Sequence, residues 1–330
     1  MKPFRTILHA LSKDLNIQHQ SGVCLIGSCF SEHIGHKLDK AKFKVLQNPF
    51  GILYNPFSIA KSLQRIITNR PFTQDDLVAH NGLWVSFEHH SRFSDVSREL
   101  ALKKMNQSLE NAHHFLKSAK VIFISLGTAK VYRLKSTKKT VANCHKFPAT
   151  SFDHSLSEKK EIVAVLAQAL QALQTFNPGL NVLFTVSPVR HLKDGFVENQ
   201  RSKSTLLLAV AKLQEQFTGV DYFPSYEIML DDLRDYRFYE SDLVHPNPLA
   251  VDYIFDFFGR TYFDKSTTQL IRHISKIQDA VNHRPFHPAS QAYQVFLTQT
   301  IQKIATLQAQ HPFLDFRKEE ELLRQRRQSI

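Results

Sequence analysis

The sequence predicts an α/β fold in which a mostly parallel sheet is covered by helices. Short apolar runs alternate along the chain with stretches of helical periodicity, and several of those runs are apolar at every position. Runs of that kind are typical of strands buried on both faces, as in parallel sheets. A third observation is that residues 265–330 contain helical patterns but no strand pattern.

Strand-length apolar runs are found at Val23–Ile26, Leu83–Phe87, Val121–Leu126, Val182–Val186 and Asp221–Phe223. Between and after them the periodicity predicts helices at Phe30–Lys40, Pro56–Ile67, Ser97–Lys117, Ser157–Thr175, Ser202–Phe217 and Leu249–Phe258. In the first helix the apolar residues Phe30, Ile34 and Leu38 are four apart, which places them on one face.

No linker rich in Gly, Ser or Pro divides the chain, and no internal repeat is visible. We therefore predict that residues 1–264 form one α/β domain, which contains insertions, and that residues 265–330 form an α-helical extension. The extension ends in the charged tail RKEEELLRQRRQ. It would pack on the domain or mediate self-association, which makes a homo-oligomer one of the expected states.

Composition excludes several classes of protein. With 330 residues, 42% of them hydrophobic, the chain is neither disordered nor of low complexity. No apolar run approaches the ~20 residues of a membrane span. The N-terminus lacks the apolar stretch of a signal peptide, and the three cysteines have no CxxC spacing, so we predict reduced thiols and a cytoplasmic protein. Cys144 and His145 have no second pair to complete a zinc site, so no metal or cofactor is predicted.

The net charge of +12 lies in residues 1–150, whereas residues 151–330 are nearly neutral. A basic half could attract an anionic substrate, a nucleic acid or a membrane surface. A solvated basic face is the simpler interpretation. Since the chain contains no Arg/Lys-rich arm and no nucleic-acid-binding motif, we expect no nucleic-acid partner.

Ser28 stands where the strand at Val23–Ile26 gives way to a helix. At that junction its hydroxyl would lie at the carboxyl edge of the sheet, where open α/β folds bind ligands. The helix N-terminus behind it offers unpaired N–H groups that favour a developing oxyanion. Serine is also a common N-cap, and the stretch is not a GxSxG elbow, so a purely structural role stays open.

Asp242 and His245 stand three residues apart, just before the helix at Leu249–Phe258. Pro246 disfavours helical dihedrals at His245, and the Asn-Pro pair that follows fits a helix start. A tight loop would bring the carboxylate to one imidazole nitrogen and leave the other free as a general base. The spacing itself is common enough to arise by chance.

The stretch IGSCFSEHIG, residues 26–35, resembles the signature of the GSCFA family, which belongs with the SGNH (GDSL-like) hydrolases. Further matches follow in the family's order: NPFG and YNP within residues 48–56, LGTA at 126–129, NCHK at 143–146, SPVRH at 187–191, and YE and RDYRFY within 226–239. Together they cover roughly residues 20–260. The resemblance implies a flavodoxin-like three-layer α/β/α sandwich.

Carried over residue by residue, the resemblance makes Ser28 the nucleophile, His245 the base and Asp242 the group that orients His245. It also implies an oxyanion hole built from the Ser28 N–H, the Gly51 N–H and an Asn side chain. Here the chain departs from the pattern, because Ala129 stands where that Asn would be. Thr128, Asn143 and Asn48 are the candidate replacements; a lost donor costs about 3–4 kcal/mol of transition-state stabilisation.

Other polar residues in the matching segments could grip a polar or anionic substrate, namely His145, Lys146, Arg190, His191 and Arg237. Each is also explained as a structural ion-pair or hydrogen-bond partner. Cys29 at the helix N-terminus could have a lowered thiol pKa. We expect its side chain, one position past Ser28, to point elsewhere along the first turn.

These observations predict a serine esterase or acyl hydrolase acting on a small acyl ester. An O-acetyl group on a sugar or glycan is the substrate class that the SGNH resemblance favours. The alternative is a non-hydrolytic acyltransferase, or a member of the fold that binds an anionic glycan or protein through its basic half.

Overall fold

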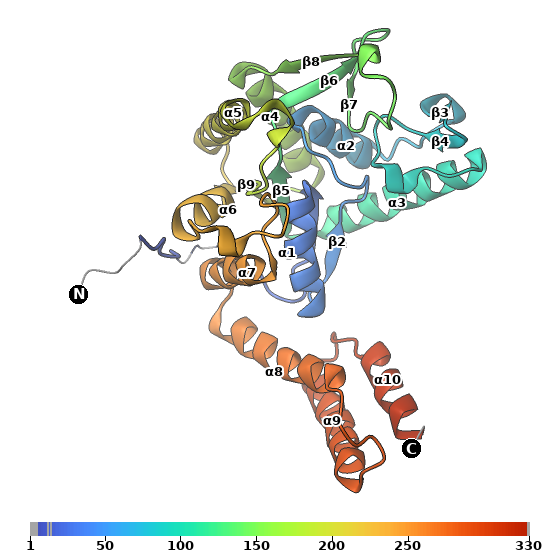
Figure 1. The fold of residues 1–330 in the computed structure, drawn as a ribbon, viewed down its shortest axis with the longest axis vertical. Helices are drawn as coiled ribbons and strands as arrows, with labels where there is room; N and C mark the ends of the chain where they lie inside the picture. Colours follow the sequence, from blue (N-terminus) through green and yellow to red (C-terminus); the bar gives the residue numbers. More distant parts are fainter. Residues whose placement is uncertain (1–5, 12, 14, 329–330) are drawn as a thin grey trace.

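The computed structural model describes residues 6–11, 13 and 15–328. Its central sheet has five parallel strands in the order β10-β9-β5-β1-β2 (Figure 1). The strands are β1 (Val23–Gly27), β2 (Val45–Gln47), β5 (Val121–Leu126), β9 (Asn181–Val186) and β10 (Val220–Tyr222). Numbered within the sheet, this is the flavodoxin-like order 2-1-3-4-5. The predicted α/β fold with a mostly parallel sheet is therefore confirmed.

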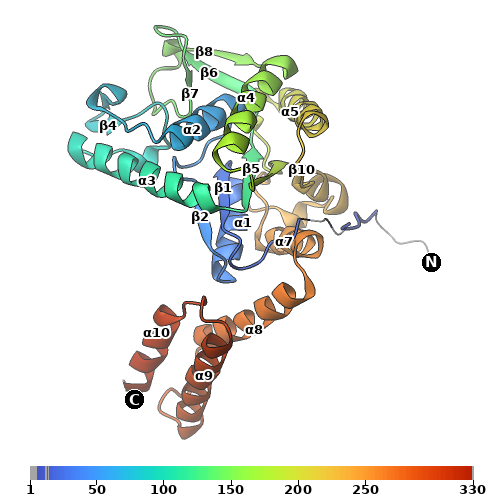
Figure 2. The same ribbon diagram turned by 180° about the vertical axis from the view of Figure 1, so that it is seen from behind.

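Helices cover both faces of the sheet, which makes three layers. One face carries α2 (Pro56–Thr68), α3 (Arg98–Ser118), α4 (Lys159–Phe176) and α5 (Phe196–Gln216). Figure 2 shows α3 and α4 over this side. The other face carries α1 (Cys29–Lys40) and α7 (Pro248–Tyr262). Alternate strand residues serve the two cores: Cys24 and Ile26 face the first set, and Val23 and Leu25 face the second.

The helices begin where the sequence provides caps. In α2 the Asn55 side chain accepts the Ser58 N–H at 2.8 Å, and Pro56 occupies the first helical position. The apolar stripe predicted in α1 is buried, since Phe30, Ile34 and Leu38 are all fully covered. The polypeptide between β10 and α7 forms the short α6 (Ser225–Glu227) and a π turn at Ile228–Asp232.

One predicted strand lies outside the central sheet. The run at Leu83–Phe87 forms β4 (Leu83–Val85), which pairs antiparallel with β3 (Val78–His80) in a separate hairpin. Leu83 is exposed and only Val85 is buried, so this run does not occupy a position buried on both faces. A second sheet, unforeseen in the sequence, has the order β7-β6-β8 and comprises β6 (Lys130–Leu134), β7 (Thr140–Val141) and β8 (Phe152–Leu156).

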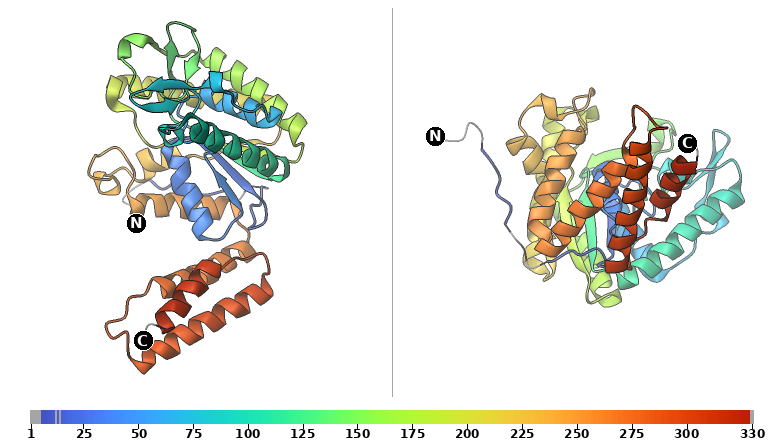
Figure 3. Two further views of the ribbon diagram at one scale, coloured as in Figure 1. Left: turned by 90° about the vertical axis from the view of Figure 1, so that its right-hand side faces the viewer. Right: turned by 90° about the horizontal axis from the view of Figure 1, so that it is seen from below.

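The C-terminal helices α8 (Lys265–Asn282), α9 (Gln291–Gln310) and α10 (Arg317–Gln328) bury an apolar cluster of their own, which includes Ile274, Leu297, Ile304 and Phe316. They lie beyond the amino-terminal edge of the sheet, below the α/β layers in Figure 3. The division between residues 264 and 265 stays a prediction.

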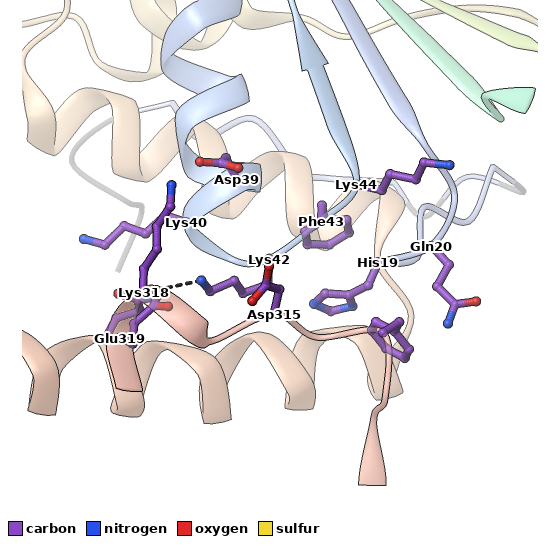
Figure 4. A pocket seen from close by; sticks show the side chains of 12 residues that line it. His19, Gln20, Asp39, Lys40, Lys42, Phe43, Lys44, Asp315, Lys318 and Glu319 are labelled. Carbon is purple, nitrogen blue, oxygen red and sulfur yellow. Dashed lines mark hydrogen bonds and ion pairs between the residues drawn. The ribbon is translucent and has the colours of Figure 1, made fainter. Parts of the chain in front are cut away.

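The C-terminal helices meet the α/β part around Lys42. Its ammonium group pairs with Glu319 at 2.6 Å and lies 5.0 Å from the centre of the Phe316 ring. His19 stacks on Phe43 at this contact, and both line an open pocket of about 820 Å³ (Figure 4). Among the described residues, no helix is both long and apolar enough to cross a membrane.

Candidate active site

The carboxyl end of β1 runs directly into the first turn of α1. Gly27 has a φ of +138°, and a Cβ on it would lie 2.1 Å from the Ser125 carbonyl oxygen on β5. Only glycine fits at that approach. The Gly27 N–H donates to Asn48 Oδ1 at 2.9 Å, and the Asn48 amide nitrogen donates to Glu32. Asn48 therefore fixes the end of β1, and its amide is not free to act as an oxyanion donor.

Ser28 is turned into the sheet. The residue is fully buried, its hydroxyl lies 2.7 Å from the Ser125 hydroxyl, and its N–H donates to the Ser125 carbonyl at 3.0 Å. The expectation that the hydroxyl faces the ligand-binding edge is wrong, because the serine packs against the neighbouring strand β5. The Ser28 N–H, expected in the oxyanion hole, is already used by the same strand.

A pocket of about 410 Å³ opens at the carboxyl edge of the sheet, and Cys29 lies in its wall. The other lining residues come from the loops after β2, β5 and β9, from the β6–β7 sheet and from the loop before α7: Tyr54, Asn55, Thr128, Lys130, Tyr132, Val141, Ala142, Asn143, Cys144, Val189, Arg190, His191 and His245. Cys29 does point in a different direction from Ser28, as predicted, but it is Cys29 and not Ser28 that shares a cavity with His245.

The thiol of Cys29 is held in its neutral form. Burial raises its pKa above the usual value, opposed by the positive charge of Lys203 and by the first-turn N–H groups of Cys29 and Phe30. The expected lowering of this pKa is wrong, because desolvation outweighs the helix terminus. A neutral thiol needs a base before it can react.

His245, oriented by Asp242, is a candidate for such a base. Asp242 Oδ2 lies 2.6 Å from His245 Nδ1, while Oδ1 accepts the N–H groups of Val244 and His245 at 2.9 and 3.0 Å. These contacts lower the pKa of Asp242 to about 2, so its carboxylate stays charged. Within the described residues His245 Nε2 has no hydrogen-bond partner, and the ring lines the pocket. The arrangement leaves Nε2 able to take a proton.

The loop that carries this pair is fixed at both ends. Leu243 sits at its tip with a φ of +59°, and its carbonyl accepts a hydrogen bond from Arg190 Nη2 at 2.8 Å. Asn247 closes the loop, because its side chain caps α7 through the Ala250 N–H at 3.1 Å. The imidazole is therefore held in one orientation by its own loop and by the residues after β9.

Among the remaining oxyanion candidates, only Asn143 keeps a spare donor at the pocket. Gly51 donates its N–H to the Asn48 carbonyl at 2.7 Å and does not line the pocket. Thr128 lines it, but its N–H donates to the Tyr54 carbonyl and its hydroxyl contacts Ser202. Asn143 also lines it, and its Oδ1 accepts the His145 N–H. In the described part of the chain, the Asn143 amide nitrogen has no partner.

A comparison with protein-family models decides the family. The model of the GSCFA family matches residues 22–258, and the model described as "GSCFA domain protein, C-terminal domain" matches residues 274–329. The chain belongs to the GSCFA family. A search of curated proteins gives no match to this GSCFA protein.

Solved structures similar to this GSCFA protein include three esterases. One is a carbohydrate esterase family 3 from Talaromyces cellulolyticus, 12% identical, with a TM-score of 0.35 over 77% of this chain and 98% of that chain. A crystal structure of an acetyl esterase mutant with acetate ion is 11% identical, with a TM-score of 0.36 over 77% of this chain and 98% of that chain. An acetyl xylan esterase from the rumen bacterium Butyrivibrio proteoclasticus is 12% identical, with a TM-score of 0.37 over 75% and 67%.

Of the five predicted substrate-binding residues, the structure brings two to the pocket of this GSCFA protein. Arg190 and His191 line it, whereas the other three do not. His145 is buried, with Nε2 on the Ser86 carbonyl at 2.8 Å. Lys146 and Arg237 are exposed outside it. These three are corrected to structural or surface positions.

His191 is neutral in the pocket wall of the GSCFA protein. Burial, followed by the positive charge of Lys203, lowers its pKa to about 4. Its Nε2 is buried without a partner among the described residues, and its ring packs edge-on against Tyr54 at 5.1 Å. A neutral imidazole can offer one hydrogen bond to a bound polar group but no charge.

Lys203 is a buried charged residue near this site that sequence reasoning missed. It is fully buried on α5, and its ammonium group donates to the carbonyls of Gly127 and Ser187, each at 2.7 Å. Within the described residues it has no carboxylate partner, and burial lowers its pKa to about 7. The signal was available in the sequence, because Lys203 lies on the same helical stripe as Leu206 and Val210.

Proposed function

We propose that this GSCFA protein hydrolyses acyl esters at the pocket lined by Cys29 and His245. The observation that carries the proposal is the His245 ring, held through Nδ1 by the ionised Asp242 carboxylate and, among the described residues, left without a partner at Nε2 on an open cavity. A base oriented in this way serves acyl transfer, since it takes the proton of a nucleophile and returns it to the leaving alcohol.

The nucleophile predicted from the resemblance was Ser28. Its buried hydroxyl contacts Ser125 rather than an imidazole. The Asp242–His245 dyad therefore supports the proposal independently of Ser28. The first-turn N–H groups of α1 add a positive helix end beside the pocket, which would stabilise a tetrahedral oxyanion. The amide nitrogen of Asn143, which has no partner among the described residues, is a further donor for that charge.

The pocket supports a small acyl ester on a polar carrier as substrate. Its volume of about 410 Å³ lies in the range of small-ligand sites. Arg190, in its wall, has a buried Nε without a partner and no carboxylate beside it among the described residues. Such a guanidinium favours an anionic group on the substrate. We propose an O-acylated sugar or glycan, with an acidic group near the ester, as the substrate class.

The test is hydrolysis of p-nitrophenyl acetate and of acetylated xylo-oligosaccharides by wild type and by His245→Ala. The proposal expects turnover by wild type and a loss of about 100-fold or more in kcat in the variant. His273→Ala, at an exposed histidine on α8, is the matched control and should keep the wild-type rate. Equal rates in wild type and His245→Ala would remove His245 as the base.

A further inference from the structure

Two consecutive residues at the start of α1 send their side chains in different directions. Ser28, at the N-cap, turns inward to Ser125, and Cys29, at the first helical position, lines the pocket. Ser28 has extended dihedrals (φ −68°, ψ 171°) and Cys29 is the first helical residue, so the two side chains leave the backbone in different directions. Upstream, the Gly27 φ of +138° and its close approach to Ser125 fix the backbone that enters this turn.

We infer that the Cys29 thiol is the nucleophile of this site and carries the acyl group as a thioester. The inference rests on the proposed ester hydrolysis and names the residue that forms the covalent intermediate. It follows from the cavity that Cys29 and His245 share, from the exclusion of Ser28 from that cavity, and from the charge of Lys203, which favours a thiolate at Cys29.

Ser28 lacks what a nucleophile needs. Among the described residues its hydroxyl has one hydrogen-bond partner, the hydroxyl of Ser125, which is itself fully buried. Neither hydroxyl is a base at neutral pH. Since Ser28 is 0% exposed, an ester carbonyl has no approach to its oxygen. For His245 to activate it, the Ser28 side chain would have to leave its contact with Ser125 and turn into the pocket.

Cys29 has the complementary surroundings. Its thiol is neutral because it is buried, and His245, which lines the same pocket, has no partner at Nε2 among the described residues. The charge that develops on sulfur is favoured by Lys203 and by the N–H groups of Cys29 and Phe30. Lys203 has no carboxylate partner among the described residues, and burial lowers its pKa to about 7 because a buried cation is costly without an anion nearby. A transient thiolate at Cys29 would provide that anion.

The reaction balances without a further reagent. Sγ attacks the ester carbonyl carbon as its proton passes to His245 Nε2, and the carbonyl electrons move to oxygen. The oxyanion collapses, the bond to the alkoxide breaks, and the proton on Nε2 goes to the leaving alcohol. Water then attacks the thioester while His245 takes one of its protons. When the carbon–sulfur bond breaks, Sγ recovers that proton and a carboxylic acid is released.

Cys144 must be distinguished from Cys29, because both thiols line the pocket. Cys144 lies in the loop after β7 and not at a helix N-terminus, and its pKa is raised by burial with only Lys193 opposing. Cys24 is fully buried within β1. A thiol reaction confined to Cys29 therefore distinguishes this inference from general cysteine reactivity.

The experiment is peptide mass spectrometry of the full chain, acid-quenched during turnover of p-nitrophenyl acetate. The expected result is an acetyl adduct on Cys29 that neutral hydroxylamine removes, as a thioester requires. The adduct should persist in Cys144→Ser and Ser28→Ala and disappear in Cys29→Ala. Cys29→Ala should lower kcat by about 1,000-fold or more, with circular dichroism confirming that it folds.

Other outcomes separate this inference from the proposed function. An adduct on Ser28, or wild-type turnover by Cys29→Ala together with loss in His245→Ala, overturns Cys29 and leaves ester hydrolysis standing. Absence of turnover and of any adduct in wild type removes both. If Cys29→Ala does not fold, the position of the acetyl adduct in the wild-type peptides decides alone, because the adduct lies on Cys29 or it does not.

Discussion

His245 and Asp242 are joined by a 2.6 Å contact between Nδ1 and Oδ2, and the same carboxylate accepts the His245 N–H through its other oxygen. One side chain thus fixes both the ring and the backbone that carries it. The loop presents at the pocket a histidine whose second nitrogen has no hydrogen-bond partner in the part of the chain that the structure describes, which is the geometry of a general base.

Asp242→Asn should lower kcat by about 100- to 10,000-fold, because the neutral amide no longer holds the imidazole in the required tautomer or stabilises its charged form. Steady-state hydrolysis of p-nitrophenyl acetate measures the change. Asp235→Asn is the matched control, since Asp235 is exposed and lies outside the pocket. A wild-type kcat in Asp242→Asn would contradict the orienting role.

Asn143→Ala should reduce kcat by about 100-fold and leave KM nearly unchanged. The amide nitrogen of Asn143 has no partner among the described residues, so its contribution should appear only as charge develops on the carbonyl oxygen. Asn69→Ala, in the turn that ends α2, serves as a control for a general Asn effect on the assay. A change confined to KM would assign Asn143 to ground-state binding instead.

Arg190→Gln should raise KM about 10-fold or more for esters that carry a carboxylate, and much less for p-nitrophenyl acetate. The guanidinium faces the pocket without a carboxylate partner in the described chain, and a charge-assisted hydrogen bond is worth about 1.5–3 kcal/mol. Comparing p-nitrophenyl acetate with the mono-p-nitrophenyl ester of succinate isolates the charge. If KM rises equally for both substrates, Arg190 acts through its hydrogen bond to the Leu243 carbonyl and not through contact with the substrate.

Gly27→Ala should destabilise the fold by about 2–4 kcal/mol. The new Cβ would overlap the Ser125 carbonyl oxygen at 2.1 Å, and the φ of +138° disfavours a side chain. Gly82→Ala is the matched control: Gly82 has a φ of +73° but nothing within 4 Å of the added Cβ, so it should cost about 1 kcal/mol. Urea unfolding measures both, and equal losses would contradict the tight approach of β1 to β5.

His89→Phe should reduce the loss of stability in acid. His89 stacks on Phe50 at 4.6 Å, its ring nitrogens have no partner among the described residues, and burial lowers its pKa to about 3. The unfolded chain binds this proton near pH 6.5 and the folded chain does not, so stability is full above pH 6.5 and falls as the pH drops toward 3.

At pH 5 this single histidine should cost the wild type about 2 kcal/mol relative to pH 7. The difference in unfolding free energy between the two pH values should shrink by that amount in His89→Phe. At exposed His287 the same substitution should leave the difference unchanged. An acid loss identical in wild type and His89→Phe would mean that His89 is charged in the folded state.

Much of the fold could be predicted because its buried strands are apolar at every position. The runs at Val121–Leu126 and Val182–Val186 coincide with β5 and β9 to within one residue. Strand β2 was missed because it has three half-buried residues and ends in Gln47. The strand β6 was missed because its partly exposed residues include Lys130 and Arg133, whose side chains carry no apolar signal.

The site could be predicted only in part. The contact between Asp242 and His245 could be predicted because the two residues are three apart on one tight loop. Which of Ser28 and Cys29 faces the cavity could not be read in the same way, because the phase of α1 is set by a contact with Ser125, 97 residues further along. Lys203 was overlooked for a similar reason, since its partners are carbonyls at the ends of β5 and β9.

The most direct test of the central claim, that esters are hydrolysed at the pocket shared by Cys29 and His245, is graded alkylation of a Cys144→Ser variant with iodoacetamide. The fraction of Cys29 alkylated and the residual hydrolysis of p-nitrophenyl acetate are measured in the same samples. Residual activity should fall in proportion to alkylation and reach zero when Cys29 is fully modified. Undiminished hydrolysis by the fully alkylated protein would contradict the account.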